Sequence, residues 1–113
     1  MPLTFYGLKS CDSCRAALKA LASAGIETDV KDVRDDGVPE EVLRQALDQH
    51  GEDRVVNKRS TTWRGLDEAA RAQDPVRLLA ANPSLMKRPL ILAADGGSTI
   101  GWDAKARAAH GLA

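Results

Sequence analysis

The chain has 113 residues, of which 43% are hydrophobic and 28% are charged, a composition typical of one globular domain with a core of moderate size. Sixteen lysines and arginines balance sixteen aspartates and glutamates, so no net charge attracts the protein to nucleic acid or to a membrane surface. Aromatic residues are only 4% of the chain, too few for a base-stacking surface, and no apolar run reaches membrane-spanning length. We therefore expect a single domain over residues 1–113 that contacts neither nucleic acid directly nor a membrane.

A short apolar segment near the start of the chain leads to two cysteines three residues apart. Leu3 to Tyr6 predicts a buried strand, which ends in a loop at Gly7. The alanine- and leucine-rich segment Ser13–Ala24 predicts a helix, and Gly25 is well placed to end it. Cys11 and Cys14 therefore stand at the junction between a strand and a helix.

This junction predicts a thiol site. The first turn of a helix offers unpaired N–H groups and a positive dipole end, both of which stabilise a thiolate, and Cys11 stands where it would feel both. Lys9 and Arg15 should lower the pKa of Cys11, whereas Asp12 should raise it, so the sign of the net effect stays open. Cys11 is interpreted as the attacking thiol, against the alternative of an ordinary buried cysteine.

Cys14 lies about one helical turn further on, on the same side as Leu18, Leu21 and Ala22. It is either a resolving thiol or a small residue of the core. Two cysteines without a recognisable secretion signal indicate the cytoplasm, where a dithiol is more often catalytic than structural. A zinc site would need His50 and His110 at irregular separations, so no metal is expected.

The next segments predict a second strand and then a group of helices. Ile26–Val33 alternates apolar and charged residues, which indicates a half-buried strand parallel to the first. After a turn at residues 34–37, Pro39 is expected at the first position of a helix that ends at His50, whose simplest role is that of a cation at the helix C-terminus. Two shorter helices are predicted over Leu66–Gln73 and Pro75–Ala81.

The segment Val55–Gly65 lacks periodicity and contains three cations and three hydroxyl groups in close succession. It is consistent with a solvated loop, and its donors also suit an oxyanion or the carboxylates of a small thiol.

The last third predicts two further strands and a helix. Leu90–Ala93 is a continuous apolar run typical of a buried strand, followed by a hairpin turn at residues 95–98 and an antiparallel strand over Thr99–Trp102. Asp103 is expected to cap a final helix that runs to His110. The helical region at about residues 39–82 is then an insertion between a βαβ unit and a ββα unit.

This order, with a proline directly before the third strand, resembles the thioredoxin-like fold, an α/β fold whose four-stranded mixed sheet is flanked by helices. More narrowly, the sequence resembles the arsenate reductase and Spx family, and within it the arsenate-reductase-related subgroup called YffB. Three motifs carry the resemblance, at residues 6–13, 57–67 and 87–90: Tyr6-Gly7-Leu8-Lys9-Ser10-Cys11-Asp12-Ser13, Asn57-Lys58-Arg59-Ser60-Thr61-Thr62-Trp63-Arg64-Gly65-Leu66-Asp67 and Lys87-Arg88-Pro89-Leu90.

The resemblance implies that Cys11 is the nucleophile and that Pro89 is the cis proline beside it. Arg59 and Arg88 match two family arginines that bind an oxyanion or hold the thiolate, the alternative for each being an exposed surface charge. Within the first motif, Lys9 and Ser10 are expected to contribute to substrate or anion binding. Catalytic roles are thus expected for Cys11, Cys14 and Arg88.

Two departures from the family pattern bear on function. Arsenate reductases of the family carry a third arginine where this chain has Ile100-Gly101-Trp102, so arsenate reduction is not expected. The cysteine at position 14 is shared with the Spx regulators. We expect a thiol-dependent oxidoreductase that uses glutathione as co-substrate, binds no cofactor tightly, and acts on a small-molecule or protein disulfide. The alternative is an Spx-like regulator whose Cys11–Cys14 pair controls binding to RNA polymerase.

Overall fold

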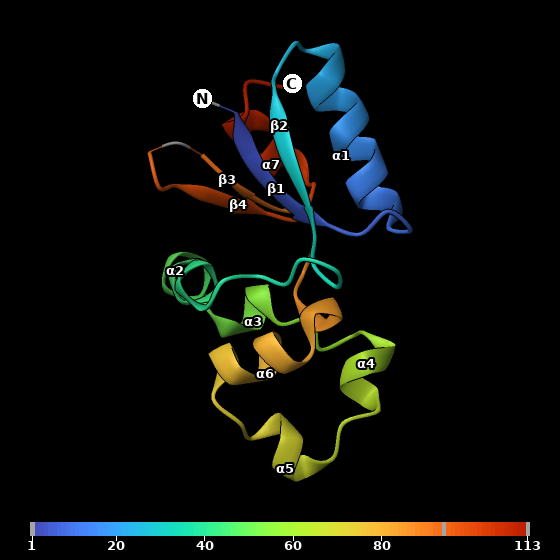
Figure 1. Cartoon of the computed structure of the whole chain (residues 1–113), viewed down its shortest axis with the longest axis vertical. Helices are drawn as coiled ribbons and strands as arrows, with labels where there is room; N and C mark the ends of the chain where they lie inside the picture. Colours follow the sequence, from blue (N-terminus) through green and yellow to red (C-terminus); the bar gives the residue numbers. More distant parts are fainter. Residues whose placement is uncertain (1, 94, 113) are drawn as a thin grey trace. The chain divides into compact units, whose positions relative to one another are not determined.

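A computed structural model describes residues 2–93 and 95–112, and the chain divides into two compact units (Figure 1). The sheet unit comprises residues 2–32 together with the described residues from Arg88 onward, and the helical unit comprises Val33–Lys87. Two of the three motifs, those with the cysteines and with Pro89, lie mainly in the sheet unit, and the motif with Arg59 lies in the helical unit. The expectation of one domain over residues 1–113 stays a prediction.

The sheet unit is built on a four-stranded mixed sheet, as predicted. Its strand order is β2-β1-β3-β4, in which β1 is parallel to β2 and antiparallel to β3, and β3 is antiparallel to β4. The register aligns Phe5 of β1 with Val30 of β2 and with Ile91 of β3. The strands are β1 (Leu3–Gly7), β2 (Thr28–Asp32), β3 (Leu90–Leu92) and β4 (Ser98–Ile100).

Helix α1 (Asp12–Ser23) connects β1 to β2 and covers the sheet unit's core. A fully buried cluster joins the strands to this helix through the side chains of Phe5, Cys14, Ala17, Leu21 and Ile91. The prediction that Ala22 belongs to the inner face was wrong, because Ala22 is exposed and Ala17 takes that role. At about 100° per residue, position 22 lies about 80° away from Cys14 around the helix axis, too far for a methyl group to reach the core.

Two expectations for the end of the chain are confirmed. The turn after β3 closes a hairpin, in which the Ala93 N–H donates to the Gly97 carbonyl over 2.8 Å. Asp103 caps the final helix α7 (Ala104–Ala109) by accepting a hydrogen bond from the Ala106 N–H at 2.8 Å.

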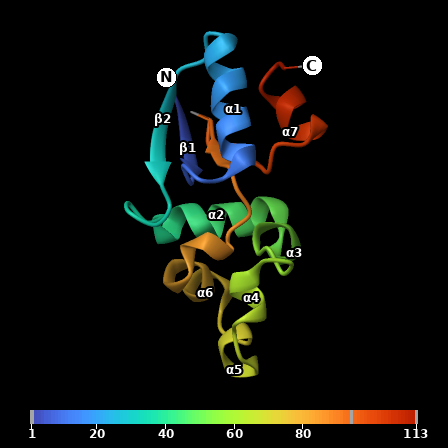
Figure 2. The ribbon, with the colours of Figure 1, turned by 90° about the vertical axis from the view of Figure 1, so that its right-hand side faces the viewer.

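The second strand is more exposed than its sequence pattern indicated. Val30 was expected on a half-buried face, but its side chain is 52% exposed, which corrects that prediction. The reason is that β2 is the outermost strand of the sheet, where a side chain has neighbours on one side only. Figure 2 shows β2 at the margin of the sheet unit.

The helical unit contains short helices joined by tight turns. They are α2 (Glu40–His50), α3 (Glu52–Val55), α4 (Thr61–Arg64), α5 (Glu68–Arg71), α6 (Pro75–Ala81) and the 3-10 turn η1 (Pro83–Leu85). Helix α2 packs against α6 and buries Leu43 and Ala46, while α6 buries Leu78 and Leu79. An isolated bridge between Val56 and Met86 ties the middle of this unit to its C-terminal end.

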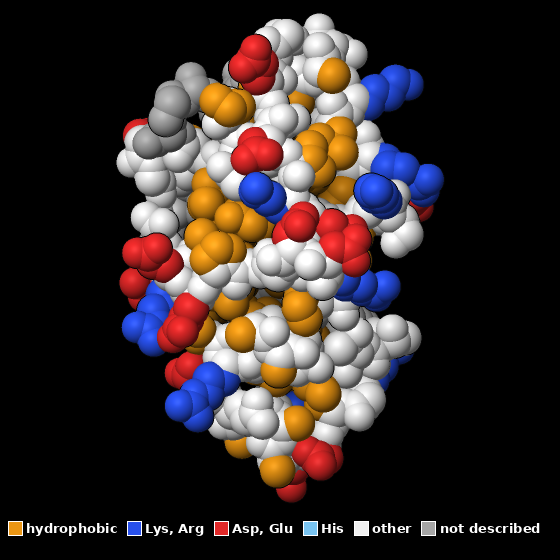
Figure 3. Space-filling model, in the orientation of Figure 1, with side chains coloured by type: hydrophobic (Ala, Val, Ile, Leu, Met, Phe, Trp, Pro, Cys, Tyr) orange, Lys and Arg blue, Asp and Glu red, His pale blue; other side chains and the backbone are white. Residues whose placement is uncertain are grey.

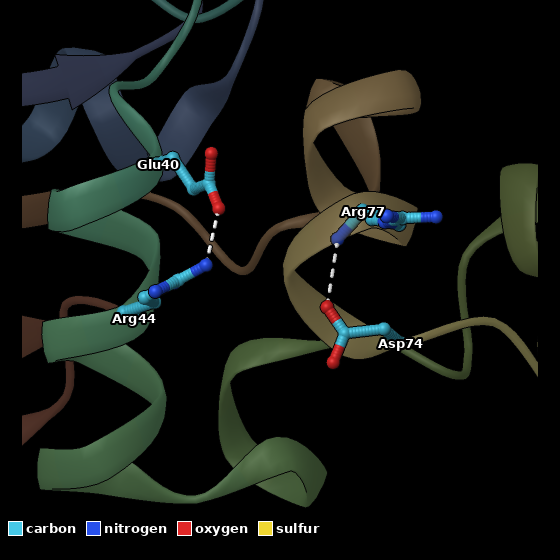
Figure 4. Close-up of polar contacts among 4 residues, drawn as sticks. All are labelled: Glu40, Arg44, Asp74 and Arg77. Carbon is cyan, nitrogen blue, oxygen red and sulfur yellow. Dashed lines mark hydrogen bonds and ion pairs between the residues drawn. The ribbon is translucent and has the colours of Figure 1, made fainter.

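Local capping explains where these helices depart from the predicted bounds. Pro39 is the residue before α2, not its first residue. The helix expected over Leu66–Gln73 is reduced to α5, which Asp67 caps at the Ala70 N–H over 2.8 Å. In Figure 4, α2 carries an exposed ion pair between Glu40 and Arg44, and Asp74 caps α6 at the backbone N–H of Arg77 over 3.3 Å.

Candidate active site

Cys11 occupies the N-cap position of α1, as the sequence predicts. Its backbone is extended, with φ −85° and ψ 120°, and its carbonyl accepts the hydrogen bond of the Arg15 N–H over 3.0 Å. The Cys11 N–H in turn donates to the Leu8 carbonyl over 3.1 Å, which fixes the turn between β1 and α1. The side chain of Cys11 is partly exposed, so its sulfur is accessible at the tip of a twelve-residue helix.

The surroundings of Cys11 favour its thiolate. Burial raises the pKa of Cys11, but the backbone N–H of Cys14, the Cys14 thiol and the Arg88 guanidinium all donate to its sulfur, and together they lower that pKa. The positive charge of Arg88 acts in the same direction. The backbone N–H of Cys14 has the largest lowering effect on this pKa, and Arg88, a residue of the segment just before β3, adds to it.

Cys14 has the opposite electrostatic character. Its side chain is only 1% exposed, and this burial raises the pKa of Cys14 to about 11. A backbone hydrogen bond from Leu8 lowers that pKa, but the sulfur of Cys11 raises it further. At neutral pH the pair therefore consists of one sulfur inclined to ionise and one that stays protonated and donates to it. No disulfide joins the two cysteines.

Gly7, at the end of β1, provides the space that Cys14 occupies. A Cβ atom at Gly7 would lie 2.7 Å from the Cys14 sulfur and 2.8 Å from the Cε1 atom of Phe5, distances that real side chains do not reach. The tyrosine-glycine pair in the first motif thus has a packing explanation, because the second sulfur approaches the strand too closely for any side chain at position 7.

Arg88 and Pro89 precede β3 and belong to the same unit as the two cysteines. The peptide bond between them is cis, as the resemblance implied, and Pro89 is buried with its carbonyl accepting the Gly101 N–H over 3.0 Å. Arg88 is half-buried and donates to the Cys11 sulfur. The structure therefore brings together three residues that the sequence assigned to one site: Cys11, Cys14 and Arg88.

The other charged residues near the cysteines are exposed. Lys9 and Ser10 lie in the turn just before Cys11, open to solvent. Arg15 forms an ion pair with Asp12 one turn along the helix surface, and neither residue is among the groups that shift the pKa of Cys11. Their pairing leaves Arg88 as the cation that acts on the sulfur.

Arg59 lies in the helical unit, in a concave cationic surface. Its N–H donates to the Asn57 side chain over 3.2 Å, and Ser60 closes the same turn by capping α4 at the Trp63 N–H over 3.1 Å. A cavity of about 350 Å³ is lined here by the four cations Arg54, Lys58, Arg59 and Lys87, together with Asp53, Val56 and Asn57. Cooperation between Arg59 and Cys11 stays a prediction.

Comparison with known proteins decides the family. The model of the ArsC family matches residues 6–109, nearly the whole chain. The chain belongs to the ArsC family.

Relatives of this ArsC-family chain include both arsenate-reductase-related proteins and regulators. It is 47% identical over 107 residues to an uncharacterized protein of Haemophilus influenzae, covering 91% of this chain and 93% of the relative. It is 28% identical to the global transcriptional regulator Spx of Staphylococcus saprophyticus, covering 80% of this chain and 72% of Spx. The regulatory protein MgsR of Bacillus subtilis is 30% identical over 95 residues, with 80% and 75% coverage.

Solved structures agree with this assignment and confirm the thioredoxin-like fold. The YFFB protein superimposes with a TM-score of 0.85 at 33% identity and covers 95% of this chain and 96% of its own. An arsenate reductase (ArsC) related protein from Brucella melitensis superimposes with a TM-score of 0.71 at 31% identity, with 97% and 94% coverage.

Three features of this ArsC-family chain were not singled out from its sequence. Arg54 and Lys87 line the cationic cavity with Arg59, although they lie far apart in the chain and no local pattern links them. The side chain of Trp63 lies between two cations, 5.6 Å from the Lys58 Nζ atom and 5.2 Å from the Arg71 guanidinium carbon. Arg71 also donates to the Trp63 carbonyl over 3.1 Å, so the tryptophan of the second motif helps to hold α4 and α5 together.

Trp102 lies in the segment Ile100-Gly101-Trp102, where the resemblance implies a third arginine in arsenate reductases, and its side chain belongs to the core of the sheet unit. It packs against the Phe5 cluster and stacks on the ring of His110, with centroids 6.2 Å apart and 21° between the planes. His110 bonds to the Thr99 hydroxyl over 2.8 Å, and burial lowers its pKa. Within residues 2–93 and 95–112 there is no cluster of three or more potential metal ligands, and no helix of this range is long and apolar enough to span a membrane.

Proposed function

We propose that this ArsC-family protein is a thiol-dependent oxidoreductase with Cys11 as its nucleophile. The observation that carries the proposal is the contrast between two adjacent sulfurs. Cys11 is partly exposed, accepts a hydrogen bond from Arg88 and has a lowered pKa, whereas Cys14 is buried and has a raised pKa. Such a pair suits thiol–disulfide exchange, because the attacking sulfur must be ionised near neutral pH.

In the proposed reaction the Cys11 thiolate attacks one sulfur of a substrate disulfide. A mixed disulfide forms at Cys11, the substrate S–S bond breaks, and the other substrate sulfur leaves as a thiolate that takes a proton from solvent. Glutathione then attacks the Cys11 sulfur of the mixed disulfide, so that the remaining substrate thiol leaves and a Cys11–glutathione disulfide forms. A second glutathione attacks the glutathione sulfur of that disulfide, which releases glutathione disulfide and regenerates the Cys11 thiolate. In sum, one substrate disulfide is reduced to two thiols and two glutathiones become one glutathione disulfide.

Cys14 offers a second route of resolution. Its thiol donates to the Cys11 sulfur, so it is within reach of a mixed disulfide formed there. If Cys14 loses its proton and attacks, the second substrate thiol leaves and a Cys11–Cys14 disulfide forms, which two glutathiones would reduce. Burial raises the pKa of Cys14, which lowers the fraction of its thiolate and so slows this route at neutral pH.

We assign substrate binding to cations in both units. Arg88 would stabilise negative charge on the departing sulfur next to Cys11. In the sheet unit, Lys9 and Ser10 would bind anionic groups of the substrate. Separately, in the helical unit, the cationic cavity around Arg59 supplies donors that suit the carboxylates of glutathione or another anion.

The test is turnover of a model disulfide by glutathione, followed through glutathione disulfide formation. Wild type should be active, Cys11→Ser should lose activity to the uncatalysed rate, and Cys14→Ser should retain most of it. Arg88→Met should reduce kcat/KM by about tenfold to a thousandfold, while Lys19→Met, which removes an exposed charge from α1, should have no effect. Activity that survives in Cys11→Ser would contradict the proposal.

A second candidate function rests on the Cys14 position and on the Spx relatives. In that case the Cys11–Cys14 pair would act as a redox switch for binding RNA polymerase. If the protein is such a regulator, we expect no turnover of disulfides. We also expect polymerase subunits to co-purify with it in a way that depends on the oxidation state of the two cysteines. The two outcomes separate an enzyme from a regulator in one pair of measurements.

A further inference from the structure

The outer strand of the sheet, β2, has an edge to which no strand is paired among the described residues. The sheet ends at β2, which pairs only with β1 on its inner side. In Figure 1 this strand stands in front of the sheet, and in Figure 2 its outer side forms the margin of the sheet unit. An edge strand of this kind offers a row of backbone donors and acceptors to another strand.

The hydrogen bonds to β1 show which backbone groups face outward. The Leu3 N–H donates to the Glu27 carbonyl over 3.0 Å, so the backbone groups of Glu27 point toward β1. Because the direction of these groups alternates along a strand, those of Asp29 and Lys31 also point toward β1. The N–H and C=O groups of Thr28 and Val30 therefore point to the open edge.

In β2 the apolar side chain of Val30 stands between two residues of opposite charge, Asp29 and Lys31. Val30 is the exposed large hydrophobic residue of the described chain, at 52% exposure. Asp29 and Lys31 flank it on the opposite face of the strand, where the Lys31 Nζ atom lies 3.6 Å from the Asp29 carboxylate and both side chains are about half exposed. Figure 3, which views the molecule from the side of this edge, shows acidic, basic and apolar side chains next to one another over the sheet unit.

We propose that β2 is a self-complementary interface through which two copies of this chain pair, antiparallel, with Val30 on the two-fold axis. In this register Val30 faces Val30 of the second copy as a hydrogen-bonded pair that exchanges two backbone hydrogen bonds. Asp29 then faces Lys31 of the second copy, and Lys31 faces its Asp29. The four strands of each copy would join in one continuous sheet.

Charge selects this register over its neighbours. Only shifts of two residues keep outward-facing backbone groups opposite one another. One such shift would place Asp29 opposite Asp29, and the other would place Lys31 opposite Lys31, each a like-charge pair at close range. Opposite charges facing each other across strands are favourable and like charges are not, so the pairing centred on Val30 is the one that the sequence of β2 supports.

The interface is small, because β2 has only five residues. It falls in the class of weak, transient contacts, so the dissociation constant of the dimer should be micromolar or higher and should increase with added salt. Both copies use the same patch, and the contact therefore closes as a dimer and does not extend into a fibre.

The test is sedimentation equilibrium of the full chain over a wide concentration range, with a reducing agent present to exclude disulfide-linked dimers. The wild-type average mass should rise toward twice the monomer mass. Lys31→Asp, which creates acidic pairs across the axis, should weaken association at least tenfold. The exchanged variant Asp29→Lys/Lys31→Asp restores opposite charges and should return to within about threefold of wild type.

The matched control is Lys19→Asp, which makes the same charge change on the exposed surface of α1 and should leave association unchanged. Circular dichroism verifies that each variant is folded, and hydrogen exchange should show protection of the Val30 amide that increases with protein concentration. A wild-type chain that stays monomeric at millimolar concentration, or an exchanged variant that fails to recover association, would overturn the proposal.

Discussion

At the scale of single residues, the ionisation of Cys11 depends on a donor that lies far from it in sequence. The helix N-terminus, the dithiol spacing and the local charges could all be predicted from the sequence. The charges of Lys9, Arg15 and Asp12 did not decide whether the pKa of Cys11 is raised or lowered. Asp12 and Arg15 pair with each other, and Arg88 acts on the sulfur. Sequence reasoning identified Arg88 by resemblance alone, because its approach to Cys11 depends on how the chain folds back at β3.

Replacing Arg88 should raise the pKa of Cys11. In a Cys14→Ser background, where one sulfur titrates, Arg88→Met removes both the hydrogen bond and the positive charge that favour the thiolate. We expect the pKa of Cys11 to rise, which is measured by the ultraviolet absorbance of the thiolate as the pH is varied. Lys19→Met is the control. An unchanged titration in Arg88→Met would show that the helix terminus alone stabilises the thiolate.

At the scale of elements, the contact between β1 and α1 determines where the second sulfur lies. The sequence predicted both elements, left Cys14 open between a resolving thiol and a core residue, and did not explain the role of Gly7. That role depends on how closely strand and helix approach, with 2.7 Å between the Cys14 sulfur and a Cβ atom placed at position 7. Periodicity describes which side of a helix is apolar, but it does not give the distance between packed elements. The exposure of Val30 escaped prediction for a related reason, since edge and central strands share the same alternation.

A side chain at Gly7 should destabilise the protein through its overlap with Cys14. Gly7→Ala is expected to lower the free energy of unfolding by about 1–3 kcal/mol, measured by urea denaturation. In Gly7→Ala/Cys14→Ala the loss should be smaller than the sum of the two single changes by about 0.5 kcal/mol or more. Gly65→Ala is a suitable control, because a Cβ atom there meets no atom closer than 3.5 Å. Strict additivity of the two changes would rule out the overlap.

At the scale of the whole molecule, two units of different character are joined in one chain. The order of the elements along the chain, the parallel direction of β1 and β2, the hairpin of β3 and β4 and the position of the helical insertion followed from hydrophobic patterns and turn residues. The pairing of β1 with β3 did not. The interior of the helical unit was less predictable, because helices as short as Thr61–Arg64 and Glu68–Arg71 depend on capping by Ser60 and Asp67 and not on periodicity. The cationic cavity around Arg59 likewise unites residues from three separate segments, which no local motif reports.

The raised pKa of Cys14 predicts a specific loss of global stability in alkali. Its pKa is higher in the folded state than the ordinary value of 9.0, so folding favours the protonated thiol. This contribution is fully present below about pH 9 and is lost as the pH rises toward 11. In a Cys11→Ser background, the free energy of unfolding should fall more steeply over this range when Cys14 is present than in Cys11→Ser/Cys14→Ala. Equal slopes in urea titrations of the two variants would contradict the assignment.

The two tryptophans are divided between the units, with Trp63 held by cations in the helical unit and Trp102 stacked on a histidine in the sheet unit. Each unit therefore contains its own intrinsic fluorophore. Trp63→Phe and Trp102→Phe leave a single emitter in one unit or the other, so the same denaturant titration can be followed twice. Coincident emission curves would mean that the inserted helices and the sheet unfold together as one cooperative domain. Separate curves would mean that the sheet unit, with Cys11 and Cys14, can stay folded while the inserted helices unfold.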